Sequence, residues 1–198
     1  MKILLASENK HKVEEIKILL QPLGYNIISL LDLSDVDAPE ETGSTFEENA
    51  LIKATSLHRL YGGIVIADDS GLEVDALAGQ PGVRSKRYSQ AATDEANNKK
   101  LLNALSSFPP KQKGRFVCAV AICTSGKQHV YRSVCEGTIR QKSQGSGGFG
   151  YDPLFCPDAH PDKTMAELTK LEKNDISHRG LAFKKLPKIL EELLSSSQ

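Results

Sequence analysis

The stretch IVIADDSG (residues 64–71) decides how this chain folds. Its four leading apolar residues follow two glycines, which predicts a fully buried and central strand. Asp68 and Asp69 come directly after that strand, where each carboxylate would lose several kcal/mol of solvation if it stayed dry. Ligands of open α/β sheets bind at this end of the strands, so a carboxylate pair here suits a hard cation or a base above a bound phosphate. A strand that runs into a solvated turn explains the same residues, and both interpretations stay open.

Strands and helices alternate around this stretch, and a hairpin follows later in the chain. Ser44 and Glu47 have capping-box spacing and open a helix, and Pro187 is expected to kink or restart the last helix. The pattern predicts an α/β fold in which a mixed sheet carries helices on both faces, as a single domain over residues 1–198. The expected strands are residues 2–6, 26–33, 64–67, 115–124 and 129–140, and the expected helices are residues 13–23, 45–61, 94–105, 163–173 and 177–196.

Composition and charge argue against several classes of protein. The 198 residues include 25 Lys plus Arg and 25 Asp plus Glu, so no net field attracts the chain to nucleic acid or to anionic lipid. No apolar run approaches the roughly 20 residues of a membrane helix, and the apolar run at the start is too short for a signal peptide. We therefore expect a cytoplasmic protein with neither a nucleic-acid nor a membrane partner. The 4 cysteines form no Cys-x-x-Cys pair and are expected to be reduced core residues.

The loop at residues 34–44 carries further carboxylates, which are Asp35, Asp37, Glu40 and Glu41. Mg²⁺ sites usually take one or two carboxylates together with phosphate oxygens of the substrate. Either Glu40 or Glu41 is therefore a candidate to join Asp69 at a magnesium ion. The alternative is an ordinary solvated loop.

Lys53 interrupts an otherwise apolar helical stripe. Phe46, Ala50 and Leu57 fall on the same face of the expected second helix as Lys53, and the four residues follow one another at three- and four-residue steps. A lysine in this position either extends its ammonium group along the apolar surface to water or holds it against phosphates near the acidic strand end. The two interpretations carry equal weight at this point.

The segment SENKHK (residues 7–12) lies between a strand and the start of a helix. Backbone N–H groups and the positive end of the helix dipole point at an anion in this geometry, and three basic side chains strengthen the case. The segment contains no glycine and lacks the spacing of a Walker A loop. It is therefore a candidate phosphate site of another kind.

The glycine-rich segment GSGGFG (residues 145–150) matches the letters of a dinucleotide-binding fingerprint. Such a fingerprint must open a helix, but Pro153 follows closely and disfavours helix for Asp152. We therefore do not interpret it as a dinucleotide site. A glycine-rich loop with one exposed Phe149 instead lets a planar base approach the backbone and stack on the ring.

Basic residues also begin the last expected helix, at His178 and Arg179, with Lys173 a few residues earlier. A positive charge at a helix N-terminus works against the helix dipole. The placement has a purpose if these residues meet an anion or the carbonyl of a base. Otherwise they are ordinary surface residues.

Six segments in this order resemble the inosine-triphosphate pyrophosphatase family, the Ham1/RdgB-type enzymes. No single match is specific, but together they cover the chain from residue 7 to residue 180. The matching segments are Ser7-x-Asn9-x-x-Lys12, Glu40-Glu41-Thr42-Gly43, Thr45-Phe46-x-Glu48-Asn49-Ala50 with Lys53, Ala67-Asp68-Asp69-Ser70-Gly71, Gly147-Gly148-Phe149-Gly150-Tyr151-Asp152-Pro153 and Ser177-His178-Arg179-Gly180.

This resemblance implies a Mg²⁺-dependent enzyme that hydrolyses deaminated purine nucleoside triphosphates (ITP, dITP and XTP) to the monophosphate and pyrophosphate. It implies a homodimer whose elongated mixed sheet is flanked by two α/β lobes with an active-site cleft between them. Asp69 and Lys53 would be catalytic, with Glu40 and Asp69 at the metal. The implied substrate contacts are Ser7, Asn9, Lys12, Ser70, Phe149, Gly150, Tyr151, Asp152, Lys173, His178 and Arg179.

Simple chemistry agrees with this activity. Attack of water on the α-phosphorus needs a base and charge neutralisation on the departing pyrophosphate, which carboxylates, lysines and Mg²⁺ supply. Selectivity for a 6-oxo purine needs donors aimed at O6, and His178 and Arg179 can donate. Two alternatives remain: a Maf-like pyrophosphatase that acts on pyrimidine or modified nucleotides, and a nucleotide-binding module without catalysis.

Overall fold

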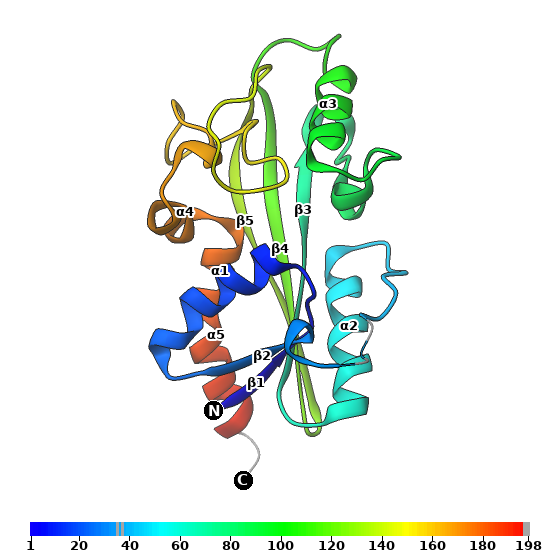
Figure 1. Ribbon diagram of the computed structural model, residues 1–198, viewed down its shortest axis with the longest axis vertical. Coiled ribbons are helices and arrows are strands. Elements are labelled where there is room, and N and C mark those ends of the chain that lie inside the picture. Colours follow the sequence, from blue (N-terminus) through cyan, green and yellow to red (C-terminus); the bar gives the residue numbers. More distant parts are fainter. Residues whose placement is uncertain (35, 37, 196–198) are drawn as a thin grey trace. The chain divides into compact units, whose positions relative to one another are not determined.

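The structure is a computed structural model that describes residues 1–34, 36 and 38–195. Asp35 and Asp37 of the acidic loop, and Ser196 at the expected end of the last helix, lie outside the described residues. The strands form one six-stranded sheet in the order β2-β1-β3-β4-β5-β6 (Figure 1). β1 pairs in parallel with both β2 and β3, whereas β5 pairs with β6 in the antiparallel sense. The mixed sheet predicted from the sequence is therefore confirmed.

Five α-helices of the described residues accompany this sheet (Figure 1). The strands are β1 Lys2–Leu5, β2 Asn26–Ser29, β3 Val65–Val74, β4 Gln112–Thr124, β5 Lys127–Ile139 and β6 Phe155–Pro157. The helices are α1 Lys10–Leu20, α2 Phe46–Tyr61, α3 Asp94–Ala104, α4 Lys170–Ile176 and α5 His178–Ser195. Short 3₁₀ helices are η1 Gln21–Leu23, η2 Leu30–Asp32, η3 Asp75–Leu77, η4 Gly82–Arg87 and η5 Met165–Glu167.

The central strand is longer than the sequence predicts, and this is the main correction. β3 was expected to end at Ala67, but it continues through both aspartates to Val74. Asp68 and Asp69 therefore lie within a buried strand and not beyond its end, and the solvated-turn interpretation is wrong. Leu72 and Val74 resume the apolar pattern beyond the two carboxylates. The carboxylates interrupt that pattern, so local hydrophobicity does not predict that one strand runs through them.

Several smaller features of the fold also differ from the prediction. β2 ends at Ser29 because Asp32 accepts hydrogen bonds from both the backbone and the hydroxyl of Ser29, which closes a 3₁₀ turn. The capping box of α2 uses Thr45 and Glu48, one residue later than predicted. The helix expected at residues 163–173 is replaced by η5 and α4, and β6 was not predicted. α5 runs through Pro187 as one helix and does not restart there.

The chain divides into two compact units, and β3, β4 and β5 contribute residues to both. The first unit is Met1–Asp69, Cys118–Ser133 and Arg179–Gln198, and the second is Ser70–Val117 and Val134–His178. The single domain expected over residues 1–198 stays a prediction.

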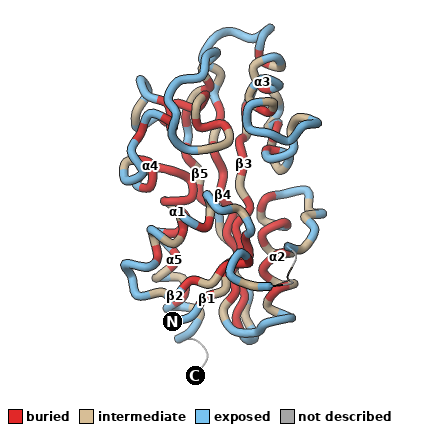
Figure 2. Tube along the Cα trace, viewed as in Figure 1, coloured by how far each residue is buried: buried red, intermediate tan, exposed pale blue. Residues whose placement is uncertain are grey.

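In the first unit, apolar faces of α1 and α5 pack on the strands. The core joins side chains such as Ile16 of α1, Phe183 of α5 and Ile66 of β3, and Figure 2 shows the buried strands in red. Within this unit, α2 lies on the other side of the strands from α1 and α5 (Figure 1). Helices thus cover both faces of the sheet here, as predicted.

The second unit has its own core, built around Leu101 of α3, Phe116 of β4 and Phe155 of β6. The rings of Phe116 and Phe155 lie 4.6 Å apart in a tilted arrangement.

All four cysteines of the chain are free and buried, and burial raises the pKa of the Cys118 and Cys135 thiols to about 12. The prediction of reduced core thiols is confirmed.

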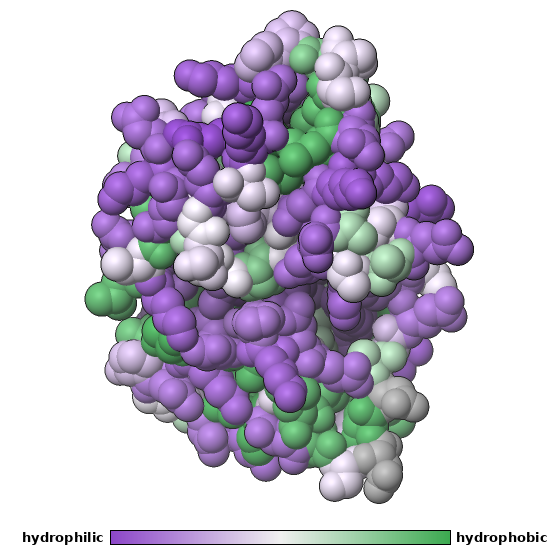
Figure 3. All heavy atoms as spheres, turned by 45° about the horizontal axis from the view of Figure 1, so that its top comes forward, coloured by the Kyte–Doolittle hydropathy of each residue, from purple (hydrophilic) through white to green (hydrophobic). Residues whose placement is uncertain are grey.

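None of the described helices is long and apolar enough to cross a membrane. Most side chains on the face in Figure 3 are hydrophilic, and apolar side chains occur there in separate areas.

We expect the burial of each leucine on α2 to determine how much free energy of unfolding is lost when it is replaced by alanine. Leu57 is fully buried, whereas Leu60 on the same helix is 73% exposed. Leu57→Ala should lower the free energy of unfolding by about 2–5 kcal/mol, because it removes buried methyl groups and leaves a cavity. Leu60→Ala should change it by less than about 0.5 kcal/mol. Urea denaturation of both variants measures this, and equal losses would contradict the burial assigned to α2.

Candidate functional site

Asp68 of β3 is a buried charge that is paired twice within the first unit. Its side chain is fully shielded from solvent, Lys12 Nζ lies 2.9 Å from Oδ2, and Arg179 lies 3.6 Å from the same oxygen. Burial alone would raise the pKa of Asp68, but the charges of Lys12 and Arg179 hold it well below its usual range. Asp68 is therefore ionised, and it fixes two cations beside the strand.

Arg179 at the start of α5 is equally enclosed. Only 2% of its side chain is exposed, and its guanidinium lies 2.5 Å from Glu15 of α1. Burial would lower the pKa of Arg179, yet Asp68 and Glu15 raise it above its ordinary value. The sequence suggested an arginine open to an anion or a base, but in the structure the guanidinium also connects α5, α1 and β3.

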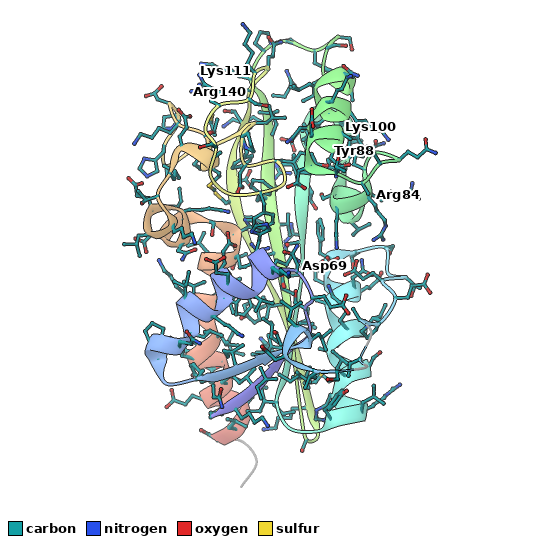
Figure 4. The ribbon with its side chains drawn as sticks, in the orientation of Figure 1. Asp69, Arg84, Tyr88, Lys100, Lys111 and Arg140 are labelled. Atoms are coloured by element: carbon teal, nitrogen blue, oxygen red, sulfur yellow. The ribbon has the colours of Figure 1, made fainter. Side chains whose placement is uncertain are left out.

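Asp69, the next residue of β3, faces α2 (Figure 4 labels its position). Asn49 Nδ2 donates a hydrogen bond of 3.1 Å to its Oδ2, and Lys53 Nζ lies 3.9 Å from its Oδ1. Lys53 Nζ also donates to the backbone carbonyl of Asp68 at 2.7 Å and to Glu41 Oε1 at 2.6 Å. The snorkelling interpretation of Lys53 is therefore wrong, because its ammonium group is buried among acceptors.

The two aspartates have opposite electrostatics. Burial raises the pKa of Asp69 above its ordinary value, and Lys53 and Lys12 offset only part of this effect. Burial would lower the pKa of Lys53, but the surrounding carboxylates, with Asp69 first, raise it. The site thus pairs a permanently charged lysine with a carboxylate that accepts a proton more readily than usual.

The acidic loop reaches this site through Glu41. Glu40 is exposed, whereas Glu41 is half-buried at Lys53. Gly43 N donates to Asn49 Oδ1 at 2.7 Å, and a Cβ at Gly43 would lie 2.7 Å from the Glu48 side chain, so the loop packs directly on the start of α2. Glycine is needed here because of this close approach.

The carboxylates of Glu41 and Asp69 are a donor set that fits Mg²⁺. Both approach the same ammonium group, at 2.6 and 3.9 Å from Lys53 Nζ, so both are directed at one place. Among the described residues no group of three or more His, Cys, Asp or Glu is arranged to hold a metal. Two carboxylate oxygens with room for phosphate and water ligands are what Mg²⁺ usually takes, unlike a closed zinc site.

The segment at residues 7–12 forms the cap of α1. Asn9 Oδ1 accepts hydrogen bonds from the backbone N–H groups of His11 and Lys12, and Asn9 N donates to Ser7 Oγ at 3.3 Å. Two of the N–H groups expected to face an anion are therefore used by Asn9. Lys12, held on Asp68, remains the cation that this segment brings to the site.

The second unit holds a separate polar cluster around Asp152. Lys173 Nζ lies 2.7 Å from Asp152 Oδ2, and the same oxygen accepts a 2.9 Å hydrogen bond from Phe149 N. The Lys173 ammonium lies 4.8 Å from the centre of the Phe149 ring. A Cβ at Gly148 would lie 2.0 Å from Asp152 Oδ2, so this turn requires glycine. Asp152 thus sets the conformation of the loop that carries Phe149.

The remaining predicted residues of the second unit lie near this cluster or in its core. Tyr151 is buried, and its hydroxyl donates to Ser85 O at 2.8 Å, so its polar end is used inside the protein. His178 is buried with its ring stacked on Phe116 at 4.8 Å. Ser70 follows Asp69 in β3 and is half-buried.

The sequence profile of the Ham1 family matches residues 3–189 of this chain. The chain belongs to the Ham1 family. The family prediction made from six segments is thereby confirmed, and the match includes every site residue named above.

Curated relatives of this Ham1 protein are similar over nearly their whole length. A dITP/XTP pyrophosphatase of Bacillus licheniformis is 48% identical over 193 residues, which cover 96% of this chain and 98% of that protein. The dITP/XTP pyrophosphatase of Bacillus subtilis is 46% identical, with 95% and 96% covered. Among solved structures, a HAM1 protein from Coxiella burnetii is 41% identical and has a TM-score of 0.87, covering 97% of this chain and 99% of that one. The Staphylococcus aureus Ham1 protein is also 41% identical, with a TM-score of 0.85 and coverage of 97% and 99%.

Sequence reasoning did not assign roles to Asp68, Glu15 or Asn49 in this Ham1 protein. Asn49 follows the cap Thr45 by about one turn, on the buried side of α2, whereas Glu15 is half-buried on α1 and reaches Arg179. That signal is available in the sequence, since an Asn on an apolar stripe is as unusual as the lysine four residues later. The pairing of Asp68 with Arg179 joins residues far apart in the chain and has no local signal.

We expect the charge of Asp68 to be essential for stability. Asp68→Asn leaves Lys12 and Arg179 without their shared carboxylate and should lower the free energy of unfolding by about 3–5 kcal/mol. Asp158→Asn is the control, because its pair with Lys113 is more than half exposed and should contribute less than about 1 kcal/mol. Urea denaturation compares the two. A loss at Asp68 no larger than that at Asp158 would contradict this account of the buried pair.

Proposed function

We propose that this chain hydrolyses deaminated purine nucleoside triphosphates, such as ITP, dITP and XTP, to the nucleoside monophosphate and pyrophosphate. The observation that carries the proposal is the buried grouping of Asp69, Lys53 and Glu41, with Lys12 held on the neighbouring Asp68. A carboxylate that accepts protons, beside cations that attract phosphate, suits the attack of water on a phosphorus atom. Membership of the Ham1 family and the names of the curated relatives support the same activity.

In this proposal Asp69 is the general base. Its pKa is raised by burial, so it takes a proton from the attacking water more readily than an exposed aspartate does. Asn49 holds one of its oxygens and Lys53 lies beside the other, which fixes the direction of the carboxylate. The water oxygen bonds to the α-phosphorus, the bond to the bridging oxygen breaks, and pyrophosphate leaves.

Lys12 and Lys53 would bind the triphosphate. Lys12 is pre-positioned by Asp68, so its ammonium group needs little ordering when an anion arrives. Ser7 and Asn9 act by shaping the cap of α1 from which Lys12 projects, in addition to the direct contacts that the resemblance implies. Arg179 would keep Asp68 ionised. A contact of Arg179 with the purine base of the nucleotide stays a prediction.

Glu41 and Asp69 are the residues that would hold Mg²⁺. The sequence left Glu40 and Glu41 open, with Glu40 preferred through the resemblance. The contact of Glu41 with Lys53, and the exposure of Glu40, favour Glu41. When bound, the ion would neutralise charge on the phosphates of the departing group.

Residues of the second unit would recognise the base. Phe149 offers a ring on which a purine can stack, and Asp152 and Lys173 fix that ring and its backbone. The contacts of Ser70, Gly150, Tyr151 and His178 with the nucleotide stay predictions. Because the hydroxyl of Tyr151 is bound to Ser85, we assign this residue to support of the loop. The homodimer and the cytoplasmic location also stay predictions.

A panel of nucleoside triphosphates tests the proposed activity. ITP and XTP should be cleaved to pyrophosphate much faster than ATP, because donors that suit a 6-oxo group reject a 6-amino group. Asp69→Asn should lower kcat by roughly 10²–10⁴-fold, because the base is lost while the shape is kept. Faster cleavage of pyrimidine or modified nucleotides would favour the Maf-like alternative, and binding of ITP without turnover would favour the non-catalytic module.

The magnesium requirement separates the two glutamates. Glu41→Gln should raise the Mg²⁺ concentration at half-maximal rate by at least about tenfold, because a ligand is lost. Glu40→Gln is the matched control at the neighbouring exposed position and should leave it unchanged. Rates measured across a Mg²⁺ titration test this. A raised Mg²⁺ requirement in Glu40→Gln, with none in Glu41→Gln, would show that Glu40 is the metal ligand.

A further inference from the structure

The glycine-rich loop at residues 145–150, which carries Phe149, is hydrogen-bonded to two side chains of α3. Asp94 Oδ2 accepts a 2.6 Å hydrogen bond from Gly150 N, and Asn98 Nδ2 donates a 2.9 Å hydrogen bond to Gly150 O. The two residues are one helical turn apart and therefore lie on the same face of α3. They hold the peptide groups on both sides of Gly150.

We propose that Asp94 and Asn98 are positioning residues for the base-stacking ring of Phe149. The peptide that Asp94 binds is the one that joins Phe149 to Gly150, so its orientation sets the plane of the backbone next to the ring. The inference rests on the proposed stacking of the base on Phe149. It gives α3, which the sequence analysis left without a role in the site, a function in substrate recognition.

The loop borders a pocket where it faces α3, and the hydrogen bonds of Asp94 and Asn98 to Gly150 link the loop to the helix there. A cavity of about 570 Å³ lies there, lined by Asn98 and Leu102 of the helix and by Gly147 and Phe149 of the loop. A loop that borders a cavity lacks the van der Waals contacts that hold a buried segment in place. Directional hydrogen bonds to its backbone, from α3 as well as from Asp152, then contribute more to its position.

The rest of α3 shows that the helix is itself well anchored in the second unit. Asn97 accepts from Ser89 N at 2.7 Å and donates to Lys86 O at 3.0 Å. Lys100 Nζ donates to Tyr88 O at 2.6 Å and lies over the Tyr88 ring (Figure 4). Neighbouring side chains therefore fix α3 to the segment 86–89, while Asp94 and Asn98 reach the glycine loop.

The decisive substitution is Asn98→Asp, which keeps the shape but directs a carboxylate at the carbonyl of Gly150. We expect KM for ITP to rise roughly tenfold, because a partly buried hydrogen bond is replaced by repulsion. The expected change in kcat is less than about twofold, because Asp69 and Lys53 are untouched. Asn103→Asp is the matched control, since it makes the same change at an exposed position of the same helix and should leave KM as it is.

A double-mutant cycle with Phe149→Ala distinguishes positioning from general damage. Phe149→Ala alone should raise KM about tenfold, because a base–aromatic stack is lost. In that background Asn98→Asp should have almost no further effect on KM, since the ring it positions is gone. Equal effects in both backgrounds, or no effect of Asn98→Asp in the parent protein, would overturn the proposal.

Two further variants keep the test decisive if Asn98→Asp folds poorly. Asp94→Ala removes the acceptor of Gly150 N and should raise KM in the same background-dependent way, whereas Glu95→Ala removes the adjacent exposed carboxylate and should not. A normal KM in Phe149→Ala has a different meaning, because it would show that the base does not stack on this ring. That result rejects the stacking part of the proposed function, and the positioning role falls with it.

Discussion

The ionised Asp68 inside β3 is the constraint on which the first unit depends. A carboxylate in this position is stable only while cations surround it, and Lys12 and Arg179 provide them from α1 and α5. Glu15 in turn balances Arg179. The sheet and two helices are thus joined by charge as well as by apolar packing, and Lys12, the proposed phosphate ligand, is held in place by a residue of the protein itself.

Adjacent positions in one strand serve opposite purposes because side chains alternate across a sheet. Asp68 meets Lys12 and Arg179 and stays charged, whereas Asp69 meets α2 and accepts protons more readily. Burial raises the pKa of both carboxyls, but Lys12 and Arg179 outweigh it at Asp68, whereas Lys53 and Lys12 offset it only in part at Asp69, where Glu41 also raises the pKa. Two aspartates that look equivalent in the sequence therefore have separate roles, one structural and one suited to catalysis.

Much of the architecture follows from local patterns, while the site does so only in part. Alternating strands and helices and the hairpin between β4 and β5 have short-range signals, and they were predicted correctly, whereas the cap that Asn9 provides for α1 was not predicted. The extension of β3 past Ala67 was not predicted although Leu72 and Val74 resume the apolar pattern, because carboxylates buried in a strand are explained only by distant partners such as Arg179. The choice between Glu40 and Glu41 likewise depended on which side chain the loop turns toward Lys53.

The close seating of Gly43 on the start of α2 makes residues 41–53 a single rigid piece. The capping box of Thr45 and Glu48 stiffens its middle, and Glu41, Asn49 and Lys53 project from it toward one carboxylate. The spacing of these three residues is therefore set together by one loop and one helix start, and a change in the loop at Gly43 displaces all of their contacts at once. To build this arrangement on another sheet, a designer would have to transfer residues 41–53 as one segment, with Gly43 included.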